Sequence, residues 1–236
     1  MENTQSIKYS FIVPFFNRWD LTLQRLNEFR KFLPDNCEIV LVDDCSTDDT
    51  VKKGIAFWQK FGVSRHTLLY KRNTKNMGFS ASMNVGAKVA TGDIFVFYSN
   101  DVILSGDVAT ELDSVFSMDE PMLVGHQLLD WDTGWNKFVF GGRDKIISYL
   151  GGYFISCKRT DWKKLEWDER YSPYDYEDVD LSLQASVLGY NLVEFRSGLL
   201  RHLSGQTISK VNQKREEITN INRVKFIEKW QEYFRK

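Results

Sequence analysis

A continuous apolar run, Ile94 to Tyr98 (IFVFY), is the feature that most constrains how this chain folds. An unbroken apolar run bounded by polar residues is typical of a strand that is buried on both faces of a sheet. Ser99, Asn100 and Asp101 follow it directly, and a second apolar stretch, Val102 to Leu104, comes next. A carboxylate at the end of a buried strand needs a partner, and a divalent cation such as Mg²⁺ or Mn²⁺ would supply one. The alternative is that Asp101 only closes a turn after the strand.

The rest of the first half alternates predicted strands with predicted helices. Short apolar runs predict strands at Tyr9–Val13, Glu38–Val42 and Thr67–Tyr70. Capping residues and helical spacing predict helices from Asp20 to about Leu33, from Ser46 to about Phe61 and from Ser80 to Ala90. The first strand is expected to stop at Pro14, because proline cannot donate a hydrogen bond to a neighbouring strand. This alternation predicts an α/β fold with a doubly wound, mostly parallel sheet flanked by helices.

Polar residues follow four of these strands at the point where each one ends. They are Pro14, Asp43-Asp44, Lys71-Arg72-Asn73 and Asn100-Asp101. The carboxyl ends of parallel strands meet at one edge of a sheet, and ligands of such folds bind at that edge. The sequence therefore predicts a ligand site there.

The second half of the chain is less regular. Apolar patterns predict strands at Leu123–Leu129, Lys137–Phe140, Tyr149–Ser156 and Asn191–Phe195, with Gly151-Gly152 allowing a close backbone approach. A helix is expected after the aromatic loop Arg170–Tyr176 and is expected to end at Gly189. The charged segment Thr207–Lys236 reads as mostly helical, with an apolar stripe at Ile218, Ile221, Val224, Ile227 and Trp230. Neither a repeat nor a low-complexity linker interrupts the chain, so one domain is expected.

Composition narrows the classes of function. The chain has 236 residues and a formal net charge of -1, so a broad basic surface for nucleic acid is not expected. Its 3 cysteines are widely spaced, which fits a reducing compartment better than a disulfide framework. No apolar run is long enough to span a bilayer. These features predict a cytoplasmic protein, and they leave attachment to a membrane surface and the oligomeric state open.

Five segments occur in the order FIVPFFN, IVLVDDCSTDDT, GDIFVFYSNDV, YEDVDLSLQASVLGY and RHLSGQT. In this order and at this spacing they resemble family 2 glycosyltransferases of the GT-A fold. The resemblance covers roughly Tyr9 to Thr207. It implies a single domain in which residues 1–106 bind a nucleotide sugar, residues 107–207 carry the acceptor and catalytic groups, and residues 208–236 form a helical tail.

The resemblance implies roles for individual residues. Asp44 matches the aspartate that reads the nucleobase edge, and Pro14 matches the position whose main chain lies beside the base. Asp101 matches the last residue of an Asp-X-Asp-type metal motif, although Ser99 stands where the first acid is expected. His202 matches a histidine that binds the cation, Mn²⁺ or Mg²⁺. The expected donor-binding set is Pro14, Asp43, Asp44, Asn73, Asn100 and Asp101.

The same resemblance implies an inverting reaction with Asp178 as the general base, and Glu177 as the second choice. A carboxylate in reach of an acceptor hydroxyl takes its proton as the new bond forms, and a divalent ion stabilises the departing diphosphate. Tyr174 and Tyr176 are expected to stack on the acceptor, a glycan or another hydroxyl compound. A uracil or thymine ring offers an N3–H donor to Asp44, which favours a UDP- or dTDP-sugar.

Other interpretations of these residues exist. Glu177, Asp178 and Asp180 are also ordinary acidic partners for a helix N-terminus. A dinucleotide-dependent oxidoreductase is rejected, because it needs a glycine-rich turn after the first strand and this chain has Pro14 to Asn17 there. A sugar nucleotidyltransferase is not expected either, because this chain lacks the glycine-rich basic loop that such an enzyme needs near its N-terminus. A catalytically weakened sugar-binding module stays open, because Asn100 precedes Asp101 in place of an acid.

Overall fold

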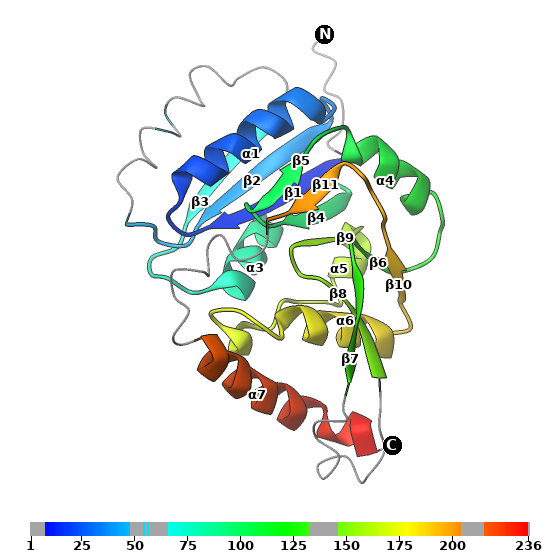
Figure 1. The fold of residues 1–236 in the computed structure, drawn as a ribbon. Coiled ribbons are helices and arrows are strands. Elements are labelled where there is room, and N and C mark those ends of the chain that lie inside the picture. The colour runs from blue at the N-terminus through cyan, green and yellow to red at the C-terminus, as the bar shows by residue number, and fades with distance from the viewer. Residues whose placement is uncertain are drawn as a thin grey trace.

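A seven-stranded sheet crosses the molecule in the strand order β10-β6-β9-β4-β1-β2-β3 (Figure 1). The computed structural model describes residues 8–47, 54, 56, 66–132, 146–203 and 215–235. The strands of this sheet are β1 (Tyr9–Phe15), β2 (Cys37–Asp43), β3 (Thr67–Arg72), β4 (Ile94–Tyr98), β6 (Met122–Gly125), β9 (Phe154–Lys158) and β10 (Asn191–Glu194).

The sheet is mixed but mostly parallel. β1 pairs in parallel with both β2 and β4, β2 pairs in parallel with β3, and β10 pairs in parallel with β6. Only β9 is antiparallel, to β4 on one side and to β6 on the other. All residues of β1, β2 and β4 are buried, as expected for strands covered on both faces. The prediction of a doubly wound, mostly parallel sheet is confirmed.

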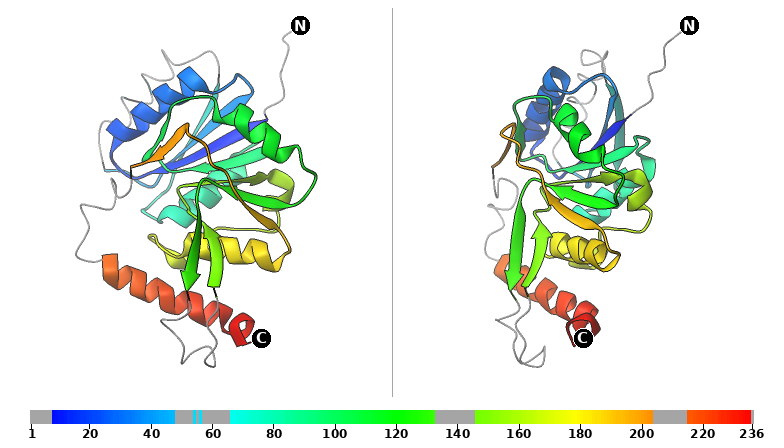
Figure 2. Two further views of the ribbon diagram at one scale, coloured as in Figure 1. Left: turned by 45° about the vertical axis from the view of Figure 1, so that its right-hand side comes forward. Right: turned by 90° about the vertical axis from the view of Figure 1, so that its right-hand side faces the viewer.

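Helices cover both faces of the sheet (Figures 1 and 2). α1 (Trp19–Phe32) and α4 (Val108–Phe116) share one buried apolar cluster with alternate residues of β1 and β4. α3 (Phe79–Val89) and α6 (Glu177–Val187) share a second cluster with the intervening residues of the same strands. The short helices α5 (Arg159–Trp162) and η2 (Glu169–Tyr171) complete the second half.

Two small two-stranded sheets flank the main one. β5 (Val102–Leu104) pairs antiparallel with β11 (Leu200–His202), and β7 (Leu128–Asp132) pairs antiparallel with β8 (Ile146–Leu150). A third apolar cluster lies between the β7–β8 hairpin, α6 and α7 (Arg215–Arg235). In Figures 1 and 2, α7 lies beside α6 at the edge of the molecule opposite α1.

Several predicted boundaries were wrong. β1 continues through Pro14 to Phe15, because its pairing with β4 already ends at Ile12 and Pro14 needs no donor on that side. The helix expected from Asp20 begins at Trp19. The helix α4, whose N-cap Asp107 accepts a 3.1 Å hydrogen bond from Thr110, was not predicted.

Two predicted single strands are each split in two. The run Leu123–Leu129 divides at residues 126–127 into β6 and β7, which belong to different sheets. The run Tyr149–Ser156 divides at residues 151–153 into β8 and β9. An apolar pattern does not mark the point at which a chain leaves one sheet and enters another. The predicted helix up to Phe61 and the strand Lys137–Phe140 lie largely or wholly outside the described residues.

The apolar stripe predicted for the C-terminal helix was partly wrong. Ile221 and Val224 are 48% and 50% exposed, whereas Asn222 and Phe226 are buried. The helix is therefore rotated so that an amide side chain points into the protein. No helix in the part of the chain described here is long and apolar enough to cross a membrane.

Candidate active site

The loops after β2 and β3 are held together by two aspartates. Asp43, fully buried, accepts hydrogen bonds from Tyr70, from Arg72 and from the Ser46 backbone N–H at 2.7 Å. Ser46 Oγ in turn accepts from the backbone N–H of Asn17, in the loop after β1. Asp43 therefore organises the loops at the carboxyl edge of the sheet.

Asp44 lies at the same edge and faces the segment before α3. Its Oδ1 accepts from Asn73 Nδ2 at 2.8 Å and from the Met77 N–H at 2.7 Å, and its Oδ2 accepts from the Gly78 N–H at 2.8 Å. Asn73 Nδ2 also donates to Ser82 Oγ. Since a carboxylate offers about four acceptor sites, three internal hydrogen bonds leave Asp44 room for one further donor.

The segment Ser99-Asn100-Asp101 follows β4, as predicted. Asn100 is buried and donates to Thr22 Oγ1 of α1 at 3.2 Å. Asp101 accepts from Ser99 Oγ at 2.6 Å, and its Oδ1 lies 3.4 Å from His202 Nε2. β5 begins directly after Asp101, and β11 ends at His202. The two strands pair with His202 opposite Val102, which brings Asp101 and His202 together.

The separation of Asp101 Oδ1 and His202 Nε2 would suit two ligands of one cation. In an octahedral magnesium site with ligand distances of about 2.1 Å, neighbouring ligand atoms lie about 3 Å apart. Burial acts to raise the pKa of Asp101, but hydrogen bonds from His202 and Ser99 prevail and hold that pKa below its usual value. Among the described residues, no group of three or more His, Cys, Asp or Glu side chains is placed to hold a metal. The pair fits a cation that takes its remaining ligands from phosphate or water.

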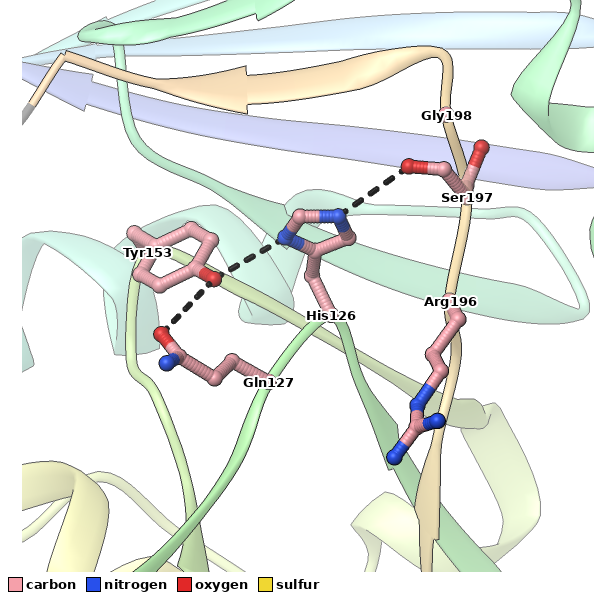
Figure 3. A pocket seen from close by; sticks show the side chains of 6 residues that line it. All are labelled: His126, Gln127, Tyr153, Arg196, Ser197 and Gly198. Atoms are coloured by element: carbon pink, nitrogen blue, oxygen red, sulfur yellow. Dashed lines mark hydrogen bonds between the residues drawn. The ribbon is translucent and has the colours of Figure 1, made fainter.

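Tyr153 supports His202 from one side. The two rings stack with centroids 4.1 Å apart and an interplanar angle of 15°. The Tyr153 hydroxyl lies 2.9 Å from His126 Nδ1 and donates to Gln127 Oε1, while His126 Nε2 faces the Ser197 carbonyl oxygen (Figure 3). These residues line a pocket of about 490 Å³. His126 thus orients the ring that stacks on His202.

Glu177 and Asp178 open helix α6, where the sequence places them. Asp178 Oδ2 accepts from the backbone N–H of Gly152 at 3.0 Å, and its Oδ1 accepts from the N–H of Val179 at 2.9 Å. A Cβ atom on Gly152 would come within 3.0 Å of Asp178 Cβ, so this contact favours glycine. The close backbone approach predicted for Gly151-Gly152 is the contact with Asp178.

The environments of the two acids differ. Burial raises the pKa of Glu177 well above its usual value, and the nearby charge of Asp178 adds to the shift. Burial also raises the pKa of Asp178, to about 6, although the N–H groups of Gly152 and Val179 oppose that rise. Near neutral pH, Asp178 is therefore mostly ionised, whereas burial favours the protonated form of Glu177.

One short turn connects the two parts of the site. Gly152 donates to Asp178, the next residue Tyr153 stacks on His202, and the Tyr153 carbonyl oxygen accepts from the Ser99 N–H at 2.9 Å. Residues from four distant parts of the chain therefore meet around residues 151–153. Tyr153 was not predicted as a site residue, although the aromatic residue after Gly151-Gly152 was visible in the sequence.

The two tyrosines of the predicted acceptor loop have protein contacts of their own. Tyr176 packs on Phe226 with ring centroids 5.7 Å apart, and its hydroxyl accepts from Trp131 Nε1 at 3.3 Å. The Tyr174 hydroxyl is buried without a hydrogen-bond partner among the described residues. Their role towards an acceptor stays a prediction.

The sequence matches known proteins over most of its length. The profile of Glycosyl transferase family 2 matches residues 10–166. The glycosyltransferase GlyG of Streptococcus pneumoniae is 27% identical over 158 residues, which are 65% of this chain and 51% of GlyG. The chain thus spans about half the length of that relative.

Solved structures share the fold. A mannosyltransferase from Pyrobaculum calidifontis, solved with GDP-Man and Mn²⁺, is 16% identical with a TM-score of 0.70, over 95% of this chain and 65% of its own. GalNAc-T7, solved with UDP, GalNAc and Mn²⁺, is 18% identical with a TM-score of 0.71, over 96% of this chain and 49% of its own. The expected GT-A fold is confirmed. With its family profile matched from Ser10 to Glu166, the chain belongs to glycosyl transferase family 2.

Proposed function

We propose that the protein is an inverting glycosyltransferase, which moves a sugar from a nucleotide-sugar donor to a hydroxyl group of a glycan or similar acceptor. The observation that carries this proposal is the position of Asp178, an acid with a pKa near 6 beside the turn that also supports the Asp101–His202 pair. Asp178 takes the proton of the acceptor hydroxyl while that oxygen bonds to the anomeric carbon. The bond from the anomeric carbon to the diphosphate breaks on the opposite face, which inverts the configuration.

The proposal includes a divalent cation, Mn²⁺ or Mg²⁺, held by Asp101 and His202. When bound, such an ion stabilises the negative charge that develops on the leaving diphosphate. Support comes from the 3.4 Å approach of Asp101 Oδ1 to His202 Nε2, and from the Mn²⁺ in the two structural neighbours. Tyr153 holds the His202 ring in the plane in which Nε2 faces Asp101.

We place the nucleoside at the carboxyl edge beside Asp44, with Pro14, Asp43, Asn73 and Asn100 shaping the surroundings. The remaining acceptor site on Asp44 suits the N3–H of a uracil or thymine ring, which favours a UDP- or dTDP-sugar. Guanine also carries an N–H on its base edge, and the mannosyltransferase neighbour binds GDP-Man, so the choice of base needs a direct test.

A panel of nucleotide-sugar donors tests both the choice of base and the proposed function. Sugars linked to UDP, dTDP, GDP and CDP are incubated with the protein and Mn²⁺, and the release of nucleoside diphosphate is measured. We expect UDP- or dTDP-sugars to be turned over fastest. A preference for GDP- or CDP-sugars would contradict the role of Asp44, and donor binding without any turnover would favour a sugar-binding module instead.

The rate should depend on pH through Asp178. Burial raises the pKa of Asp178 to about 6, and only the ionised carboxylate accepts a proton. We therefore expect kcat to fall as the pH decreases through about 6, with a slope that reports one proton. The profile is measured between pH 4.5 and 8 at saturating donor. A kcat that is constant from pH 4.5 to pH 7 would contradict this role of Asp178. It would mean that the base has an ordinary carboxyl pKa or that no base titrates in this range.

A cytoplasmic location belongs to the same proposal. All three cysteines, Cys37, Cys45 and Cys157, are unpaired thiols, which fits a reducing compartment. Nucleic acid is not an expected partner, because the formal net charge is only -1.

A further inference from the structure

Helix α7 contacts the segment that leads into Glu177 and Asp178. The segment runs from η2 to residue 176, and α7 lies beside it and beside α6 (Figures 1 and 2). The sequence resemblance assigns this helix no role beyond that of a tail. Its buried polar contacts indicate a more specific one.

The backbone just before the catalytic pair is strained. Asp175 and Tyr176 have φ angles of 70° and 78°, so two successive residues other than glycine adopt the left-handed conformation. This conformation is unfavourable for side chains with a Cβ, and it persists only where the surrounding structure imposes it. Tyr176 is also the N-cap residue of α6, so its conformation fixes the direction in which Glu177 and Asp178 leave the loop.

Asn222 of α7 supplies the contacts that impose this conformation. Its side chain is 1% exposed, and Nδ2 donates to the carbonyl oxygens of Tyr171 at 2.7 Å, Tyr174 at 2.8 Å and Asp175 at 3.1 Å. Two of these carbonyls lie just before the bend, and the third is that of Asp175 within it.

A second set of α7 contacts holds the Asp175 side chain. Thr219 Oγ1 donates to Asp175 Oδ2 at 2.6 Å, and Arg215 Nη2 lies 3.2 Å from Asp175 Oδ1. Asn222 therefore binds the main chain of the loop, whereas Thr219 and Arg215 bind the Asp175 side chain.

The helix itself is anchored to α6 beyond the catalytic pair. Asp180, fully buried, accepts from Lys229 Nζ at 2.7 Å and from Trp230 Nε1 at 2.7 Å, and Lys229 also pairs with Asp168 at 2.7 Å. Asp168 lies before the loop and Asp180 lies after the catalytic pair. α7 thus fixes both ends of the stretch that contains Glu177 and Asp178.

We propose that Asn222 is a positioning residue, which holds the 171–176 loop so that Asp178 meets the acceptor hydroxyl. This inference rests on the proposed function, in which Asp178 is the general base. Displacement of a catalytic group by about 1 Å lowers rates by up to about 10²-fold, so loss of Asn222 should cost about 10- to 100-fold in kcat.

The test compares Asn222→Ala with Asn220→Ala, an exposed asparagine on the same helix. Turnover is measured as nucleoside diphosphate release from the nucleotide sugar that the donor panel selects, and affinity is measured by calorimetry with UDP and Mn²⁺. We expect Asn222→Ala to lose 10- to 100-fold in kcat with UDP affinity within twofold, and Asn220→Ala to match the parent. Thr219→Val, which removes only the hydroxyl bonded to Asp175, serves as the milder second variant if Asn222→Ala folds poorly.

Two further measurements separate positioning from a general loss of structure. In an Asp178→Asn background, Asn222→Ala should cause no additional loss of rate, because it acts through the base; a full additional loss would overturn the inference. Amide hydrogen exchange should rise in residues 171–178 of Asn222→Ala and stay unchanged in β1, β2 and β4. Unchanged exchange in residues 171–178 would also overturn the inference, as would a parental kcat in both Asn222→Ala and Thr219→Val. A fully active Asp178→Asn variant would instead contradict the proposed function.

Discussion

Replacing Asp178 with asparagine is expected to lower kcat by about 10²- to 10⁴-fold, the usual contribution of a general base. Asparagine keeps an oxygen that can accept from the Gly152 N–H, and it remains a suitable residue for the first turn of α6. It cannot take a proton at neutral pH. The affinity for UDP with Mn²⁺ should stay within a few fold, because the base acts on the acceptor side.

The matched control for this variant is Glu177→Gln. Burial favours the protonated form of Glu177, which glutamine resembles, so we expect a much smaller loss of kcat than for Asp178→Asn. Turnover is measured with the best donor of the panel, and the unfolding temperature of each variant checks the fold. A fully active Asp178→Asn enzyme together with an inactive Glu177→Gln enzyme would assign the base to Glu177.

Replacing Asp101 with alanine is expected to remove most of the metal-dependent activity. The variant would lose one of the two protein ligands proposed for the cation, and the Lewis-acid contribution of a cation is several kcal/mol, or at least about 10²-fold in rate. In calorimetry, Mn²⁺ should no longer strengthen UDP binding. His202→Ala should show the same pattern, because the second ligand is lost instead.

The control for the metal site is Asp119→Ala, which removes an exposed carboxylate far from the carboxyl edge. This variant should keep the parental response to Mn²⁺. If Asp101→Ala bound UDP with Mn²⁺ and turned over donor as well as the parent, the cation would have to lie elsewhere.

The order of elements in the first half could be predicted because each strand is a separate apolar run with a helix after it. β2 and β4 appear within one or two residues of the predicted ranges. Their residues are buried on both faces, so a continuous apolar run identifies them without ambiguity. The polar residues at their ends then had to meet at one edge, which placed Asp44 and Asp101 correctly relative to the sheet.

The second half was harder to predict for a physical reason. β6 and β7 were predicted as one strand, and so were β8 and β9, but each pair divides between the main sheet and a two-stranded sheet. Hydrophobic periodicity reports burial and not the identity of the neighbouring strand. The division of β8 from β9 matters for function, since the turn between them contacts both Asp178 and His202.

Asn222 shows a second limit of sequence patterns. A polar residue flanked by Ile221 and Arg223 reads as the exposed face of an amphipathic helix, yet its amide is buried against three carbonyl oxygens. Only the loop that it contacts, about fifty residues earlier in the chain, explains this burial. Long-range hydrogen bonds of this kind leave no periodic signal.

The anomeric configuration of the product tests the central claim most directly. The glycoside formed with the acceptor is isolated after reaction with the best donor of the panel, and the anomeric configuration of its transferred sugar is determined by NMR from the one-bond C1–H1 coupling. Attack by an acceptor oxygen activated by Asp178, opposite the departing diphosphate, predicts a configuration inverted from that of the donor. A product that retains the donor configuration would contradict this account.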